Sequence, residues 1–167
     1  DLGPTMMGKA LDDRVGCAVI IELLQGEPLP CDLLAAFTVQ EEVGLRGAQV
    51  VGYRLEPDLA LALEGTICDD LPKEEGEDVS PVTEVGKGPA ISVMDRRSIA
   101  DPRLVSYLVS VAENHGIPYQ FRRSTMGGND AGAIHLARVG VPTASVSLPC
   151  RYIHAPAAIG SKDDFEN

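Results

Sequence analysis

"CDLLAAFTVQEEVGLRG", residues 31–47, places two adjacent glutamates where an apolar run stops. The run itself, residues 31–39, has the length and continuity of a strand that is covered on both faces of a sheet. Glu41 and Glu42 follow it, and residues 45–55 are predicted to form a short helix. Neighbouring strand residues point to opposite faces, but a bend at the strand end lets both carboxylates reach one pocket. Two surface acids in a solvated loop are the simpler alternative.

Strands and helices alternate along the rest of the chain. Further strands are predicted at residues 58–64, 89–93, 118–124 and 141–149, and helices at 13–25, 101–116, 129–140 and from 161 onward. This order predicts one α/β domain over residues 1–167, with three α/β/α layers and a mostly parallel central sheet. Residues 65–88, which contain the acidic run "EEGED" at 74–78, are predicted to be a solvated surface loop.

Composition narrows the class of protein. The chain is 44% apolar and 23% charged, which is typical of a soluble globular domain. Its net charge of −11 argues against nucleic-acid binding, which needs basic surface. No apolar run approaches the ~20 residues of a membrane span, and no signal peptide is expected. The four cysteines show no CxxC spacing, which favours reduced thiols and a cytoplasmic protein.

An acid or a histidine stands at the end of an apolar element in four places. These residues are Asp12 and Asp13, Glu41 and Glu42, Glu64, and His154. Sites in parallel sheets gather at the carboxyl ends of strands. Carboxylates packed together repel one another, and a divalent cation removes that conflict. Mixed carboxylate and imidazole ligands suit zinc, cobalt or manganese better than calcium. One glutamate of the adjacent pair can then bind metal while the other stays free as a base.

Four segments together resemble the co-catalytic metallo-aminopeptidases of the glutamyl, deblocking and tetrahedral kind. They are "GKALDDRVGCAVIIELL" (8–24), "TVQEEVGLRGAQ" (38–49), "LALEGT" (61–66) and "MGGNDAGAIHLARVGVPTASVSLPCRYIHAP" (126–156). The resemblance runs through nearly the whole chain, with the motifs in the family's order. It implies a zinc-peptidase-like fold. Cellulase-like names also occur in this family.

The resemblance implies a role for each of these residues. Asp12 would bridge two metal ions, and its peptide bond to Asp13 would be cis. Glu41 would be the general base. The implied metal ligands are Asp12, Glu42, Glu64 and His154, with Glu42 and His154 on one ion and Glu64 on the other.

The resemblance also implies a substrate pocket near the "GGNDAGAIH" segment. Asn129 and Asp130 would shape that pocket, although helix capping is the simpler role for Asp130. Arg151 reaches substrate or only supports its loop. The family commonly has Thr in place of Asn129 and Ser in place of Ala155.

The family's other features are expected to be missing from this chain. Family members carry an upstream His-x-Asp strand, whose histidine would share the metal of Glu64, and then an inserted dimerisation domain. The chain begins at Asp1, just ahead of "KALDD", and stops at Asn167, within the expected last helix. A partial catalytic domain is therefore expected. It would complete the site of Asp12, Glu42 and His154 and hold one metal ion or none, against two zinc or cobalt ions in the full enzyme.

These observations predict a metal-dependent aminopeptidase that removes N-terminal residues from peptides, with Glu41 as general base. Its partners would be peptide substrates and other copies of itself, since family members form dimers to dodecamers. A metal-free glycoside hydrolase is one alternative, although 4% aromatic content and the absence of Trp argue against a sugar-stacking platform. A non-catalytic fragment with an incomplete metal site is the other. The preferred N-terminal residue, the metal and the oligomeric state stay open.

Overall fold

The computed structural model describes residues 2–76 and 80–167, so part of the predicted acidic loop, residues 77–79, lies outside the described residues. The main sheet has the strand order β2-β5-β3-β4. Its strands are β2 (Ala60–Ile67), β5 (Thr143–Cys150), β3 (Ala90–Ser92) and β4 (Gln120–Phe121). Strands β2 and β5 pair parallel, as do β3 and β4, whereas β3 pairs antiparallel with β5. A mixed α/β fold with a mostly parallel sheet is thus confirmed.

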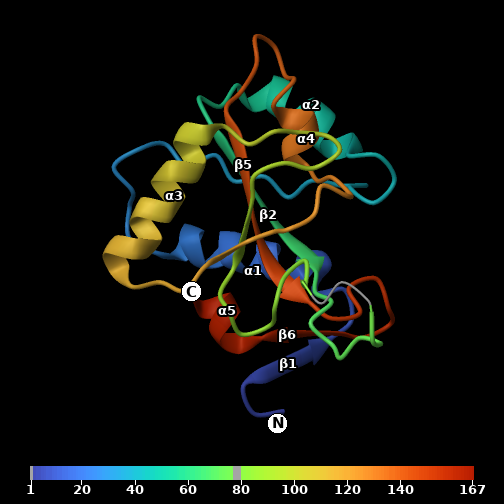
Figure 1. Cartoon of the computed structure of the whole chain (residues 1–167). Coiled ribbons are helices and arrows are strands. Elements are labelled where there is room, and N and C mark those ends of the chain that lie inside the picture. The colour runs from blue at the N-terminus through green and yellow to red at the C-terminus, as the bar shows by residue number, and fades with distance from the viewer. Residues whose placement is uncertain (1, 77–79) are drawn as a thin grey trace.

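The two long strands β2 and β5 form the centre of the molecule (Figure 1). Their register runs from Ala60 opposite Thr143 to Ile67 opposite Cys150. The first of these strands was predicted to end at Glu64, and this prediction is wrong, because the ladder continues for three more residues. Glu64 therefore lies within β2, and its side chain is buried, with 9% of the residue exposed.

The helices follow the predicted order. They are α1 (Leu11–Gln25), α2 (Arg46–Leu55), α3 (Pro102–His115), α4 (Ala131–Ile134) and α5 (Lys162–Glu166). Figure 1 shows α1 crossing behind β2 and β5. The carboxylate of Asp101 caps α3 by accepting the N–H of Arg103, and Gly116 ends that helix in the left-handed conformation. Helix α4 is much shorter than predicted, because after Ile134 the backbone continues in tight turns, with the N–H of Leu136 donating to the carbonyl of Ala133 and that of Ala137 to Ile134.

The prediction of a strand at residues 31–39 is wrong. This segment forms no ladder with any strand in the described part of the chain, and Phe37 and Val39 are exposed. Strand β2 is the edge of the four-stranded sheet. A strand needs a hydrogen-bonded neighbour, so an apolar run that fits a covered strand stays irregular when no described neighbour pairs with it.

A second, two-stranded sheet was not predicted. Strand β1 (Thr5–Gly8) pairs antiparallel with β6 (Ala158–Ser161). Both strands are four residues long and contain glycine, which gives little strand signal. This sheet lies beside the buried core of Val15, Leu148, Cys150 and Ala158. Among the described residues, no helix has the length and apolarity needed to cross a membrane.

We predict that Gly16→Ala destabilises the protein, because α1 approaches β2 at this glycine. An added Cβ would lie 2.5 Å from Asp13 Oδ2 and 2.8 Å from the carbonyl oxygen of Leu63. Overpacking of this kind costs about 1–3 kcal/mol. Urea denaturation measures the loss, with Gly26→Ala as the control, since the nearest atom there is 3.5 Å away. Equal stability of the two variants would contradict this close approach.

Candidate metal centre

Asp12 and Asp13 lie at the start of α1 in non-helical conformations. The peptide bond between them is cis, as the family resemblance implied. The Oδ1 atom of Asp12 accepts the N–H of Gly65 at 3.2 Å, and Oδ1 of Asp13 accepts the N–H of Gly16 at 3.0 Å. Backbone donors from β2 and α1 therefore orient the two carboxylates.

A tight turn carries Glu41 and Glu42. Gln40 and Leu45, on either side of the pair, have φ values of 61° and 57°, in the left-handed region that non-glycine residues rarely adopt. The N–H groups of Gly44 and Leu45 donate to the carbonyl of Glu41 at 3.0 and 2.9 Å. Such backbone conformations gather at functional sites. The bend expected after residue 39 is therefore present.

His154 lies in the turn that connects β5 to β6. Its Nε2 is 3.5 Å from Oδ2 of Asp12 and 3.7 Å from Oε1 of Glu42. One ligand atom from each of these three residues lies within 4.8 Å of the others. The structure thus brings together the three residues that were predicted to form one metal site.

Two further groups adjoin the first. Oxygen atoms of Asp12, Asp13 and Glu64 lie within 4.8 Å of one another, as do those of Glu41, Glu64 and Asp130. Asp12 joins the first group to the second, and Glu64 joins the second to the third. All four predicted metal ligands and the predicted base are therefore neighbours in one continuous cluster.

Burial governs the electrostatics of this cluster. Together with the smaller effect of nearby carboxylates, it raises the pKa of Glu64 to about 9 and the pKa of Asp13 to about 7. It also raises the pKa of Glu41 to about 7, with the charge of Glu42 adding to the effect, and raises the pKa of Asp130. Such shifts show how strongly these acids resist ionisation without a compensating positive charge.

The donor set fits divalent metal ions. Carboxylate oxygens and one imidazole nitrogen are ligands that zinc and cobalt accept. Asp130 adds to the polar character of the cluster, because its Oδ1 is buried and has no hydrogen-bond partner among the described residues. A cation would also relieve the repulsion that raises the carboxylate pKa values.

The residues predicted to bind substrate already have partners within the protein. The hydroxyl of Thr38 donates to Oδ2 of Asp130, and the N–H of Asp130 points to Oε1 of Glu64 at 3.5 Å. Oδ1 of Asn129 accepts the hydroxyl of Ser145 at 3.0 Å and the N–H of Ala131 at 3.0 Å. Asp130 thus links the segment before Glu41 to strand β2, while Asn129 links α4 to β5.

Arg151 makes an ion pair that sequence reasoning did not find. Its Nε and Nη2 atoms donate to the two carboxylate oxygens of Asp70 at 2.6 and 2.8 Å. The two residues are 81 positions apart, so no local pattern could have indicated the pair. Thr38 was missed in the same way, because its partner Asp130 is 92 positions away.

Arg97 is a further residue that the sequence did not single out. An open cavity of about 230 Å³ is lined by Glu41, Glu42, Gly44, Leu45, Arg97 and Gly128. The aliphatic stem of Arg97 crosses Gly128 and Gly132, where an added Cβ would come within 2.4 and 2.3 Å of it. The "GG" at 127–128 could have indicated a close approach of another chain segment.

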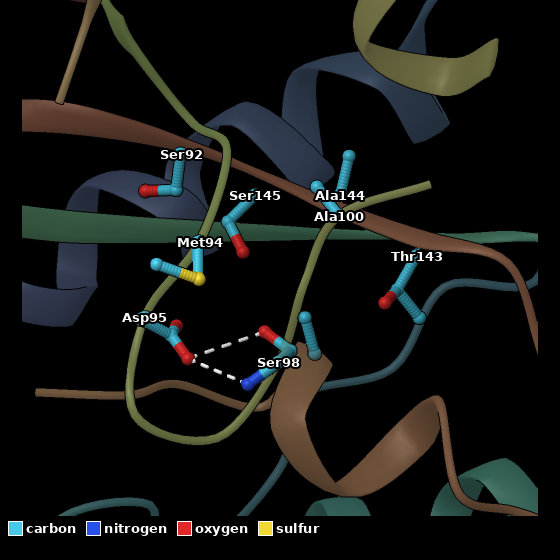
Figure 2. A pocket seen from close by; sticks show the side chains of 9 residues that line it. Ser92, Met94, Asp95, Ser98, Ala100, Thr143, Ala144 and Ser145 are labelled. Atoms are coloured by element: carbon cyan, nitrogen blue, oxygen red, sulfur yellow. Dashed lines mark hydrogen bonds between the residues drawn. The ribbon is translucent and has the colours of Figure 1, made fainter. Parts of the chain in front are cut away.

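Figure 2 shows the turn between Asp95 and Ser98, to which Arg97 belongs by its place in the sequence. Oδ1 of Asp95 accepts the N–H of Arg97 at 2.7 Å and the N–H of Ser98 at 2.8 Å. The hydroxyl of Ser98 also donates to this oxygen, at 3.3 Å. The small pocket in this view is lined by residues that include Met94, Asp95, Ser98 and Thr143, and it has no room for a water molecule. We therefore interpret these residues as packing around the turn and not as a binding site.

An α/β fold with several carboxylates and a histidine in one cluster is typical of metal-binding hydrolases. The chain belongs to the M42 glutamyl aminopeptidase family, whose sequence model matches residues 2–167. A putative aminopeptidase of Acetivibrio thermocellus is 39% identical over 99% of this chain and 49% of its own length. The glutamyl aminopeptidase of Lactococcus lactis subsp. cremoris (strain MG1363) is 36% identical over 98% of this chain and 45% of its own.

A solved structure extends this similarity to the fold. Aminopeptidase APDkam598 from the archaeon Desulfurococcus kamchatkensis superposes with a TM-score of 0.92 at 40% identity, covering 99% of this chain and 47% of that one. The chain therefore spans about half the length of the curated relatives it matches. Membership of this family does not favour the glycoside hydrolase alternative.

Without metal, we predict that the protein loses stability as the pH rises from about 4.5 to about 9. Burial raises the pKa of Glu64 in the folded state from 4.5 to about 9, so the folded protein binds more protons than the unfolded chain in this window. The stabilisation from protonated Glu64 is fully present below 4.5, its pKa in the unfolded chain, and is lost as the pH rises through about 9, its pKa in the folded protein. Thermal melting in EDTA from pH 5 to pH 9 measures the decline.

Two variants separate Glu64 from general charge effects. Glu64→Gln removes this titrating group and should reduce the decline, and Asp13 and Glu41, whose pKa values are raised to about 7, account for the remainder. Glu27→Gln removes an exposed carboxylate and should leave the decline unchanged. A melting temperature that stays constant or rises over this range in the unmodified protein would contradict the burial of Glu64.

Proposed function

We propose that this protein is a metal-dependent aminopeptidase that releases N-terminal residues from peptides. The observation that carries the proposal is the position of Glu41. Its carboxylate adjoins Glu64 and Asp130, while the neighbouring Glu42 faces His154 and Asp12. Hydrolysis at a metal needs ligands and a separate base, and this turn supplies both from adjacent residues. Family membership supports the same reaction.

The residues that would hold the metal ions follow from the clusters. Asp12, Glu42 and His154 would hold one ion, and Glu64 together with the bridging Asp12 would hold the other. Zinc or cobalt suits these ligands. When bound, the ions supply an acidified water and polarise the scissile carbonyl group.

Glu41 would move the protons. Its carboxylate takes the proton of the attacking water and passes it to the leaving amine. A general base works best when its pKa lies near the working pH, and burial raises the pKa of Glu41 to about 7. Because Glu41 and Glu42 face different neighbours, the base need not also be a ligand.

Substrate would enter through the cavity beside Glu41 and Glu42. We propose that Asn129 and Asp130 shape its inner wall, since Gly128 lines that cavity and immediately precedes them. Arg97 adds a positive side chain to the same cavity.

The domain is proposed to be part of a larger catalytic unit. The outer edge of β2 is unpaired among the described residues. Leu61 on that strand, Leu59 immediately before it and Phe37 of the irregular segment at residues 31–39 are exposed. An additional strand at this edge, such as the His-x-Asp strand that the family resemblance implies, would pair the edge and add a histidine for the metal of Glu64. Exposed sheet edges otherwise favour aggregation.

A homo-oligomer in the cytoplasm is proposed as the setting. The cysteines Cys17, Cys31, Cys68 and Cys150 are all free thiols, which suits a reducing compartment. A family relative, PhTET1-12s, was solved as a dodecamer. The exposed apolar side chains of residues 29–39 suit further protein contacts, and sedimentation analysis would give the number of copies.

We predict that Glu41→Gln lowers kcat by roughly 100- to 10,000-fold, because it removes the base but keeps the shape of the side chain. Metal content should stay as in the unmodified protein, since Glu41 is not a ligand in this proposal. Aminoacyl chromogenic substrates measure kcat, and elemental analysis measures the metal. Glu27→Gln is the control. If Glu41→Gln keeps full turnover, the assignment of the base is wrong.

Metal removal is predicted to abolish turnover. EDTA treatment followed by dialysis should eliminate release of the N-terminal residue, and added zinc or cobalt should restore it. His154→Ala and Glu42→Ala should each reduce the metal bound per chain, because both side chains face the same ion. Turnover that survives complete removal of metal would favour the carboxylate-only hydrolase considered above, and metal binding without turnover would indicate a non-catalytic domain.

A further inference from the structure

The ion pair between Asp70 and Arg151 lies outside the ligand cluster but beside it. The guanidinium donates two parallel hydrogen bonds, at 2.6 Å from Nε to Oδ1 and at 2.8 Å from Nη2 to Oδ2. The side chains of Asp70 and Arg151 are 11% and 29% exposed, so the pair is partly shielded from water. Bidentate Arg–carboxylate pairs of this kind fix orientation as well as adding energy.

Asp70 is itself anchored to the protein. Its Oδ2 accepts the N–H of Val85 at 3.0 Å. Asp70 follows the end of β2 closely. Between them, the N–H of Cys68 donates to the carbonyl of Cys150, the last residue of β5, at 3.1 Å. Asp70 therefore presents a fixed carboxylate at the place where β5 ends and the His154 turn begins.

Arg151 is the first residue of that turn. Its backbone pairs with Ile159 in both directions, at 2.9 and 3.0 Å, and this closes the base of the turn. Ile153 packs against the buried core, and Tyr152 between them has a φ of 58°. The turn is thus held at Ile153 by packing and at Arg151 by the ion pair.

His154 has little support of its own. Its side chain is 67% exposed, and its ion-pair partners in the described part of the chain are the carboxylates of Asp12 and Glu42, at 3.5 and 3.7 Å from Nε2. Those two groups are its proposed partners in metal binding. The position of the imidazole before metal binds therefore depends on the backbone of the turn.

We infer that Asp70 and Arg151 are positioning residues, which hold the turn of residues 151–155 so that His154 Nε2 faces Asp12 and Glu42. This inference rests on the proposed metal site. Of the two roles that were open for Arg151, the geometry selects support of the loop over contact with substrate. Residues that orient a metal ligand from outside the ligand set typically change metal affinity 10- to 100-fold when replaced.

The ionisation of the pair suits a stable structural contact. The hydrogen bonds from Arg151 lower the pKa of Asp70, and those to Asp70 raise the pKa of Arg151. Both groups therefore stay charged at neutral pH. A lysine could not replace the arginine, because a single ammonium group lacks the planar fork that bonds both carboxylate oxygens.

The test is a titration of the metal-free protein with Co²⁺, followed by the visible absorption of bound cobalt. Asp70→Asn and Arg151→Gln should each weaken the binding that depends on His154 by roughly tenfold. The cobalt affinity of the double variant should lie within about twofold of that of either single variant, because both changes break the same pair. Independent roles would instead multiply to about 100-fold.

Three controls make the outcome specific. Glu56→Gln breaks the Arg138–Glu56 pair, whose atoms are 2.6 Å apart and neither of whose residues belongs to the ligand cluster, and should leave cobalt binding unchanged. Melting of each metal-free variant shows whether the fold is intact. Arg151→Lys should weaken cobalt binding nearly as much as Arg151→Gln, since lysine keeps the charge but not the fork.

The results separate the inference from the proposed function. If His154→Ala leaves cobalt binding unchanged, the proposed metal site is wrong. If His154→Ala weakens binding and Asp70→Asn does not, only the positioning role is overturned. An Arg151→Lys variant that binds cobalt normally but shows a raised KM would also overturn it and would assign Arg151 to substrate.

Discussion

Desolvation of clustered carboxylates, reinforced by their mutual repulsion, is the constraint on which this structure depends. Asp13, Glu41 and Glu64 resist ionisation because they are withdrawn from water and face one another. Backbone N–H groups offset part of this cost at Asp12 and Asp13. The remainder calls for positive charge, and the described residues place no lysine or arginine in ion-pair contact with Asp12, Asp13, Glu41 or Glu64. A divalent cation would supply that charge, so the same desolvation and repulsion that weaken the fold would favour metal binding.

Glycines allow the acids to come so close together. A Cβ on Gly65 would lie 2.7 Å from the Cβ of Asp12, and one on Gly16 would meet the carboxylate of Asp13. Gly128 gives the same freedom to Arg97 at the open side of the site. Each of these glycines lies where a side chain of the site crosses another backbone, so local packing and site chemistry are fixed by the same residues. A change at any of them would alter stability and the site together.

The sequence predicted what depends on local patterns. The ends of α3 followed from Asp101 and Gly116, and the members of the ligand cluster followed from their places beside apolar elements and from family resemblance. Long-range partners were beyond reach, since Asp70 pairs with a residue 81 positions away. The error at residues 31–39 has a related cause: apolar length indicates a strand, but a strand also needs a neighbour to pair with. Whether Glu64 ends β2 was likewise decided by the length of β5 opposite it.

The structure suggests a physical reason for the different roles proposed for the two adjacent glutamates. Positive φ values at Gln40 and Leu45 turn the backbone on either side of them, and the two carboxylates have different neighbours. Glu42 has a 62% exposed side chain and faces His154, where it can meet an ion that arrives from solvent. Glu41 is half-buried beside Glu64 and Asp130, where desolvation brings its pKa to about 7. A general base must exchange a proton near neutral pH. A single peptide unit separates the half-buried environment of Glu41 from the exposed environment of Glu42.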